Sequence, residues 1–397
     1  MPVLDLEDLG FDEGAHLLLR RALAELRPGS ELAVAGRHPD LGMHLRVWCR
    51  AQGHRVRDPD GTGGAVDAWV VRGSTDVHRW AKAERAGAAE PSGIVPSPPR
   101  HWGLAPRGAL VEPGGPELPV DLADRDLVWA DAAPRLYALA ASAQWDPAAA
   151  VPWGARFRLP GEIEAAVVQV MTFLVENEQA ALVIPARLLA RIHPQFREVQ
   201  QLLAIQAADE ARHVEVFTRR ALLRGGQMGT SSVSGRQSLA TLLTEPDFSL
   251  VSFLLSVLGE GSFLNLLGFL DRHAPDPVTR EVARLARQDE ARHVAFGMAH
   301  LQHQATADAG LLARLRTAVE RRHDALASSS GLNQDVFDAL VTLAAGDWTP
   351  AAIRRGFGAV RRLQAEMDEG RQHRLGRLGF PAAEAAELSR LHTRNFM

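Results

Sequence analysis

The sequence predicts a mostly α-helical protein, in which a small α/β domain precedes a four-helix bundle with extra C-terminal helices. Three observations lead to this prediction. The five residues Asp-Glu-Ala-Arg-His occur twice, at 209–213 and at 289–293, in long segments without Gly or Pro. A glutamate precedes each copy by nearly the same number of residues. Before residue 75, short apolar runs alternate with segments of helical apolar spacing.

The amino-acid composition excludes several classes of protein. The chain has 397 residues, a net charge of −4 and one cysteine, Cys49. The charge argues against nucleic acid as a main partner. The single cysteine excludes an internal disulfide framework, and no signal peptide is visible, so we expect a cytoplasmic protein. Residues 250–270 are nearly all apolar, with Glu260 as the only charge, and we interpret them as a buried bundle helix rather than a membrane span.

Residues 1–75 have the pattern of a small α/β domain. The expected helices are 14–26 and 41–52, and the expected strands are 31–35 and 68–71.

This first domain resembles the TusA-like sulfur-carrier fold, through Leu4-Asp5, the turn at 27–32 and the segment 45–54. That family carries its sulfur on a Cys-Pro dipeptide that opens the first helix, where this chain has Asp12-Glu13. Cys49 falls in the second helix, and we interpret it as a core residue. We therefore expect a docking or structural module.

The remaining chain divides into a Pro/Gly-rich linker, 76–125, and a helical domain, 126–397, whose bundle core is about 160–305. Proline and glycine positions predict the helix limits. The expected helices are 124–141, 160–185, 194–224, 246–274 and one from Asp276-Pro277 past His300, followed by three or more helices with breaks at 328–331, 346 and 379–381.

The repeated pentapeptide carries the candidate chemistry. Glu and His at positions i and i+3 project from one face of a helix. Two such pairs, each with a glutamate from another helix, form the ligand set of a dinuclear metal site in a four-helix bundle. The candidate ligands are Glu178, Glu210, His213, Glu260, Glu290 and His293. Carboxylates and imidazoles suit iron and manganese, and four buried carboxylates need cations. The alternative is a surface ladder of charged side chains.

Two details of the site follow from helical geometry. Glu178 is preferred to Glu176 because it shares its helix face with more apolar residues. The neighbouring Asp209 and Asp289 are turned about 100° from the ligand glutamates. Because a metal-bound His usually donates its second N–H to a carboxylate, we expect Asp209 to orient His293 and Asp289 to orient His213. Arg212 and Arg292 would balance the aspartates, unless both pairs are surface ion pairs.

The two Glu…Glu-x-x-His segments resemble the ferritin-like di-iron superfamily over residues 160–305, and its monooxygenase hydroxylase subunits most closely. This resemblance implies that the six residues are iron ligands. Two departures argue against particular members. Phe217 stands where ribonucleotide reductase small subunits place a radical tyrosine, and the one tyrosine of the chain is Tyr137. Ala286 stands where AurF-type N-oxygenases have an extra histidine.

We therefore expect a di-iron oxygenase or oxidase that uses O2 to hydroxylate, N-oxygenate, desaturate or cleave a small organic molecule. Electrons would come from a ferredoxin or a separate reductase. The alternatives are iron storage with ferroxidase activity, and a docking protein with an inactive site. An Mn/Fe pair and a homodimer stay open. Gly259 and Gly261 flank Glu260 and predict either a local π-bulge or close helix packing.

Overall fold

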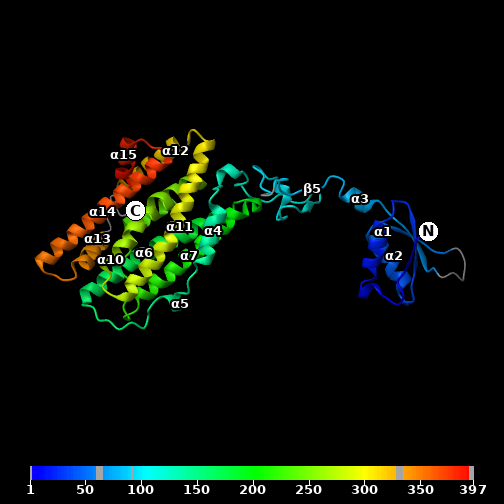
Figure 1. The fold of residues 1–397 in the computed structure, drawn as a ribbon, viewed down its shortest axis with the longest axis horizontal. Helices are drawn as coiled ribbons and strands as arrows, with labels where there is room; N and C mark the ends of the chain where they lie inside the picture. Colours follow the sequence, from blue (N-terminus) through cyan, green and yellow to red (C-terminus); the bar gives the residue numbers. More distant parts are fainter. Residues whose placement is uncertain (1, 60–65, 91–92, 328–333, 393–397) are drawn as a thin grey trace. The chain divides into compact units, whose positions relative to one another are not determined.

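The computed structural model describes residues 2–59, 66–90, 93–327 and 334–392, and it confirms a mostly helical protein with a small N-terminal sheet (Figure 1). The chain folds as two compact units. The first comprises residues 1–93 and 104–117, and the second comprises residues 94–103 and 118–397. The domain limits expected from the sequence stay a prediction.

The first unit is a four-stranded sheet with two helices. The strand order is β1 (Val3–Asp5), β2 (Glu31–Ala35), β4 (Ala68–Val71) and β3 (Arg55–Arg57), with β1 parallel to β2 and the other pairs antiparallel. The helices are α1 (Ala15–Ala24) and α2 (Leu41–Ala51). The sequence pattern did not predict β1 and β3, because three residues are too few for an alternation to be visible.

The core of this unit is formed by one face of each helix and the inner face of the sheet. Leu19, Leu45 and Cys49 pack there with Val34 and Val70. Burial raises the pKa of the Cys49 thiol to about 12, so the side chain behaves as a small apolar group. The position of Cys49 fits the expected packing role, and the resemblance to a sulfur carrier stays a prediction.

The segment expected to be a linker contains short ordered elements. They are α3 (Thr75–Arg79), η2 (Arg100–Trp102), η3 (Arg125–Leu127) and the antiparallel pair β5 (Glu84–Arg85) and β6 (Leu110–Val111). The helix expected at 124–141 begins later, as α4 (Ala133–Ser142). Pro134 explains this difference, because proline is tolerated in the first turn of a helix but not in its interior.

Four long helical segments form the bundle of the second unit (Figure 1). They are α6 (Gly161–Leu189), α7 (Arg197–Ala221), the continuous run of α9 (Phe248–Ser252), η5 (Phe253–Glu260) and α10 (Gly261–His273), and α11 (Pro277–Ala307). Helix α6 packs on α7, α10 packs on α11, and α7 contacts α11. The expected start of α11 is confirmed, since the Asp276 carboxylate accepts from the backbone N–H of Thr279.

Further helices surround the bundle. They are α5 (Pro147–Ala150), η4 (Pro194–Phe196), α8 (Val233–Leu243), α12 (Leu311–Ala327), α13 (Gln334–Ala345), α14 (Pro350–Leu378) and α15 (Ala382–His392). The expected breaks at 346 and 379–381 are confirmed, because α13 ends at Ala345 and α14 ends at Leu378. The break expected at 328–331 lies outside the described residues. Helix α12 contacts α8 and α15, so these three lie together beside the bundle.

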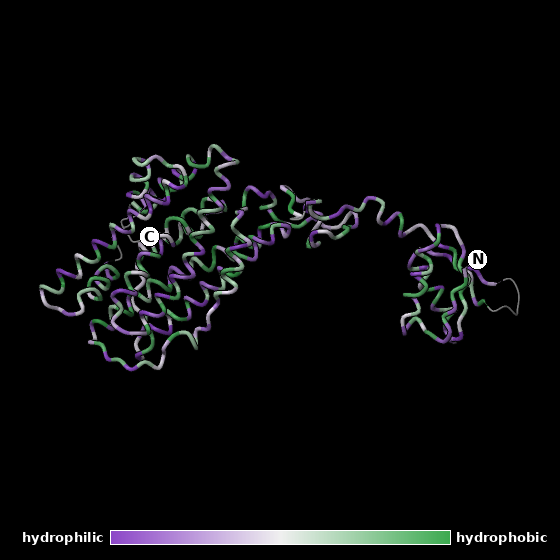
Figure 2. Tube along the Cα trace, viewed as in Figure 1, coloured by the Kyte–Doolittle hydropathy of each residue, from purple (hydrophilic) through white to green (hydrophobic). Residues whose placement is uncertain are grey.

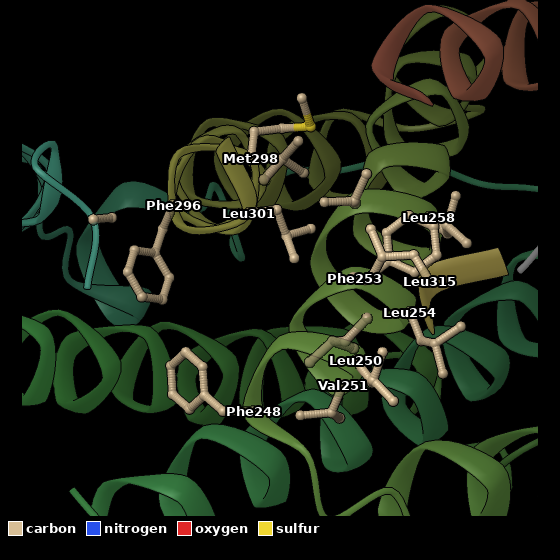
Figure 3. Packing of buried hydrophobic residues seen from close by; sticks show 14 of the residues in the cluster. Phe248, Leu250, Val251, Phe253, Leu254, Leu258, Phe296, Met298, Leu301 and Leu315 are labelled. Carbon is tan, nitrogen blue, oxygen red and sulfur yellow. The ribbon is translucent and has the colours of Figure 1, made fainter. Parts of the chain in front are cut away.

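The interior of the helical unit is apolar. One cluster gathers around Phe253, Leu254 and Leu258 from η5 together with Leu301 and Leu315 (Figure 3). Hydrophobic and hydrophilic residues alternate at short intervals along the helices (Figure 2). By length and composition, Gly161–Leu189 and Phe248–His273 could cross a membrane, but 67% and 83% of their apolar windows are buried in this unit. Burial of this kind is typical of the core helices of a bundle.

Candidate metal centre

The six residues predicted as ligands lie together in the middle of the bundle. Helix α6 provides Glu178, α7 provides Glu210 and His213, η5 ends at Glu260, and α11 provides Glu290 and His293. All six side chains are buried. Glu176, the alternative to Glu178, is half-buried and belongs to neither group of possible ligands described next.

These side chains form two overlapping groups, each with ligand atoms within 4.8 Å of one another. The first group is Glu178, Glu210, His213 and Glu290, and the second is Glu210, Glu260, Glu290 and His293. Glu210 and Glu290 belong to both groups. Two carboxylates shared between two positions, each completed by one further Glu and one His, form the donor set of a dinuclear carboxylate centre. That each residue binds metal stays a prediction.

Both imidazoles present Nδ1 to the carboxylates. Nδ1 of His213 lies 3.2 Å from Glu210 Oε2 and 3.7 Å from Glu178 Oε2. Nδ1 of His293 lies 2.9 Å from Glu210 Oε1 and 3.5 Å from Glu290 Oε2. The ring atom that would bind a metal ion is therefore Nδ1, and the opposite nitrogen, Nε2, is left for another partner.

The carboxylate oxygens have too few hydrogen-bond donors. Among the described residues, Oε1 of Glu178, Oε2 of Glu260 and both oxygens of Glu290 have no hydrogen-bond partner. Burial, together with the charges of Glu210 and Glu290, raises the pKa of Glu178 well above its usual range. Burial and the charge of Glu290 do the same to Glu260. Buried acceptors without donors are costly, and cations remove that cost, so the residues fit two metal ions.

Behind the histidines, two aspartates and two arginines form a buried network. Nε2 of His213 lies 3.1 Å from Asp289 Oδ2, and Nε2 of His293 lies 3.3 Å from Asp209 Oδ2. Arg212 contacts Asp209 at 2.5 Å and Asp289 at 3.0 Å. Arg292 contacts both as well, at 3.4 Å from Asp209. Both aspartates are about 1% exposed, so these contacts are not surface ion pairs.

Two residues of this network were not predicted as site residues. The Gln144 side-chain amide donates to Asp209 Oδ1 at 2.8 Å, and the Trp145 indole N–H donates to Asp289 Oδ2 at 2.8 Å. The Arg212 guanidinium also lies 4.6 Å from the centre of the Trp145 ring. The sequence analysis missed these contacts because both residues lie between α4 and α5, far from the repeat. The presence of a glutamine and a tryptophan in this loop was the only feature of the sequence that could have indicated the contacts.

The helix that carries Glu260 is a π-helix over Phe253–Glu260. This confirms the local π-bulge, one of the two expectations for the glycine pair. The backbone N–H of Gly261 donates to Ser256 O, five residues earlier. The Arg374 guanidinium donates to Val257 O at 2.7 Å. A Cβ atom at Gly261 would lie 2.4 Å from Arg374 Cζ, so close packing also operates here.

An apolar pocket, partly open to solvent, adjoins the glutamates. Three ligand candidates, Glu178, Glu260 and Glu290, line it. Its apolar walls include Leu239, Leu242, Leu254, Leu255 and Phe263. Neither candidate histidine lines the pocket. The metal centre therefore meets apolar walls on its glutamate side and the polar network on its histidine side.

Phe217 lies beside the centre, with its ring centroid 6.1 Å from that of His213. A phenol is therefore absent from this position, and the one tyrosine of the sequence, Tyr137, belongs to α4.

No family model and no curated protein matches the sequence. Solved structures with similar folds include a protein with aldehyde deformylating oxidase activity from Synechococcus, at 18% identity and a TM-score of 0.42, covering 58% of this chain and 96% of that one. A variant R2-like ligand-binding oxidase with an Mn/Fe cofactor has 18% identity and a TM-score of 0.44, covering 64% and 93%. Phenol hydroxylase from Pseudomonas sp. OX1 has 13% identity and a TM-score of 0.44, covering 64% and 80%. These likenesses concern the helix arrangement alone.

Proposed function

We propose that this protein is an O2-dependent oxidoreductase with two non-haem iron ions, acting on a small organic molecule. One observation carries the proposal. Four buried glutamates and two buried histidines lie together, several of their oxygens lack hydrogen-bond donors, and an apolar pocket adjoins them. A cation site against an apolar pocket suits a centre that reacts with an organic substrate.

The side chains would divide the work as follows. Glu178 and His213 would complete one metal position, Glu260 and His293 would complete the other, and Glu210 and Glu290 would be shared. When bound, the two ions would supply the reduction of O2 and the oxidation of the substrate. A manganese ion in place of one iron suits the same ligand types.

The protein around the ligands would hold and shield the reacting groups. The Asp289 and Asp209 carboxylates accept from the histidine Nε2 atoms, which fixes the ring orientation and leaves Nδ1 for the metal. The leucine and phenylalanine walls of the pocket exclude water from the substrate. Hydroxylation, N-oxygenation, desaturation and oxidative cleavage all fit this arrangement. The electrons would come from a ferredoxin or a separate reductase.

The substrate would be oxidised at the metal centre itself, without a stored tyrosyl radical. The ring of Phe217 lies beside that of His213, with the centroids 6.1 Å apart, and a phenylalanine cannot carry such a radical. Electron paramagnetic resonance of the iron-loaded protein after exposure to O2 should therefore contain no sharp tyrosyl signal. A stable tyrosyl signal would contradict this part of the proposal.

The proposal is tested by the reaction of the reduced, iron-loaded protein with O2. We expect rapid oxidation of the bound iron, which rapid-mixing absorption spectroscopy measures. We also expect O2 consumption that depends on a reduced ferredoxin or reductase. The matched control is Glu260→Ala, which removes one ligand and should lose this reaction. Uptake of many iron ions per chain would favour storage, and a reduced protein inert to O2 would contradict an oxidase or oxygenase.

A further inference from the structure

Arg322 is a buried cation that the metal site does not use. It lies on α12, lines the same pocket as Glu178, Glu260 and Glu290, and is 5% exposed. Its Nη2 donates to Ser238 Oγ at 2.6 Å, while Nε and Nη1 have no hydrogen-bond partner among the described residues. A guanidinium carries five N–H donors, so most of its capacity is unused.

No carboxylate of the described residues forms an ion pair with Arg322. Burial lowers its pKa to about 10, and no acidic group offsets that effect. The guanidinium nevertheless keeps its charge at neutral pH. A buried charge without a counter-ion is costly, and proteins ordinarily pair such charges.

Arg220 on α7 shows how this chain pairs a buried arginine elsewhere. It is fully buried, its Nη1 lies 2.7 Å from Glu164 Oε1, and its Nη2 lies 2.8 Å from Asp276 Oδ2. Its Nε also donates to Thr279 Oγ1 at 2.8 Å. Two carboxylates and a hydroxyl therefore satisfy Arg220, whereas Arg322 has a single hydroxyl. Among the described residues Arg322 therefore has no counter-ion, and an anion bound in the pocket would supply one.

The surroundings of Arg322 are positive as well. His392 on α15 lines the pocket, is 7% exposed, and has no partner on either ring nitrogen among the described residues. Burial and the charges of Arg322, Arg371 and Arg374 lower the pKa of His392 well below its usual range. A neutral imidazole there can still donate one hydrogen bond to an anion.

We propose that the pocket binds an organic carboxylate, whose carboxyl group pairs with Arg322 and whose apolar part contacts the leucine walls. A planar guanidinium fork matches a carboxylate in size and charge. The glutamates line the same pocket, so the apolar part of the substrate, rather than its carboxyl group, is presented to the metal centre. This inference rests on the proposed function, because it names the substrate class of that centre.

The test compares two probes of nearly equal size and shape, one charged and one neutral. Hexanoate and hexanamide are titrated into the full-length, metal-loaded protein by isothermal titration calorimetry. We expect hexanoate to bind at least about tenfold more tightly, the scale of one charge-assisted hydrogen bond. Arg322→Met should remove this preference and leave the affinity for hexanamide unchanged, and Arg322→Lys should restore part of it. The matched control is Arg314→Met on the same helix, where the side chain is exposed and pairs with Asp308.

Two results would overturn the inference. One is equal binding of the two probes, or no binding of either, by the wild type. The other is a preference for hexanoate that survives in Arg322→Met, which places the carboxylate on the metal ions or elsewhere.

Thermal unfolding is a second measurement, and it distinguishes a loss of ligand binding from a loss of folding in Arg322→Met. Without added carboxylate, Arg322→Met should melt at the same or a higher temperature, because it removes an unpaired buried charge. Arg220→Met should melt lower, since it leaves the carboxylates of Glu164 and Asp276 without their cation. A lower melting temperature for Arg322→Met would indicate a structural role for this arginine and would count against the inference.

Metal analysis of the same samples separates this inference from the proposed function. Metal without a hexanoate preference contradicts only this inference, whereas the preference without metal contradicts only the proposed function.

Discussion

The two sides of the metal centre differ in how well their polar groups are satisfied. On the histidine side, every carboxylate oxygen of Asp209 and Asp289 accepts a hydrogen bond, from the two arginines, the two histidines, Gln144 or Trp145. On the glutamate side, leucines line the pocket, together with Arg322 and His392. Within the described part of the chain, most of the side-chain nitrogens of these two residues have no hydrogen-bond partner.

This difference separates two tasks. The two aspartates and two arginines balance in charge, and all four aspartate oxygens accept hydrogen bonds, so the histidine side can hold the imidazoles in one orientation. The glutamate side is incomplete in polar contacts, and such sites are where a ligand gains the most from binding. The helix geometry also indicates that a ligand binds on the glutamate side. The π-helix that ends at Glu260 lies on the pocket side, and π-helical turns occur frequently at functional sites.

The largest expected effect concerns the residues shared by both metal positions. Glu210 belongs to both groups of ligands, so Glu210→Ala should lose both metal ions after iron reconstitution, as measured by elemental analysis. Glu215→Ala is the matched control, because Glu215 is exposed on the same helix. Retention of one full equivalent by Glu210→Ala would show that the two positions do not share this carboxylate.

A smaller loss is expected on the pocket side. Glu178 and Glu260 each belong to one group, so Glu178→Ala and Glu260→Ala should each lose one ion and keep the other. The same elemental analysis measures this, and the double variant should lose both. If Glu178→Ala kept full loading while Glu176→Ala lost an ion, the choice between these two glutamates would be wrong.

On the histidine side, the effect should be on affinity rather than on capacity. Asp289→Asn keeps the size of the side chain but weakens its hold on Nε2 of His213, so metal affinity should fall by about 10–100-fold. Competition with a chelator measures the dissociation constant, and Asp324→Asn at an exposed position is the control. Asp209→Asn should act alike through His293. If both variants bound metal as tightly as the wild type, the network of aspartates and arginines would have only a structural role.

The smallest effect is expected where the π-helix packs on α14. Gly261→Ala would push against Arg374, which holds the carbonyl of Val257, and should lower the free energy of unfolding by about 1–3 kcal/mol while both ions are kept. Gly376→Ala is the control on α14, because no atom lies within 4 Å of its added Cβ, and alanine there should be neutral or stabilising by about 0.5–1 kcal/mol. Urea unfolding measures both, and equal stability would show that Arg374 moves without cost.

Periodicity and repetition made part of this architecture predictable. The repeated pentapeptide and the two earlier glutamates place six candidate ligand residues at spacings that a helix bundle brings together. The role expected for the two aspartates follows from their position beside the ligand glutamates. Capping by Asp276 and the glycine breaks at 346 and 379 predicted helix ends for local reasons. The glycines beside Glu260 predicted the π-helix only as one of two alternatives, because the cause lies in packing against Arg374.

The other parts depend on contacts between residues far apart in the chain. Arg322 is one of several arginines on α12, and in the sequence it does not differ from its exposed neighbours Arg314 and Arg321. Its burial arises because α8 and α15 pack on α12, and no pattern within α12 encodes that. Gln144 and Trp145 join the site because their loop passes beside α7 and α11. Short strands such as Arg55–Arg57 escape detection because sheet pairing rather than local pattern defines them.

The iron content of the full-length wild type after reconstitution tests the central claim most directly. The claim is that Glu178, Glu210, His213, Glu260, Glu290 and His293 hold two metal ions in one buried centre. Reconstitution with ferrous iron under anaerobic conditions, removal of unbound metal and elemental analysis should give two iron ions per chain. A content of one ion or fewer, with the protein fully folded by circular dichroism, would contradict the account.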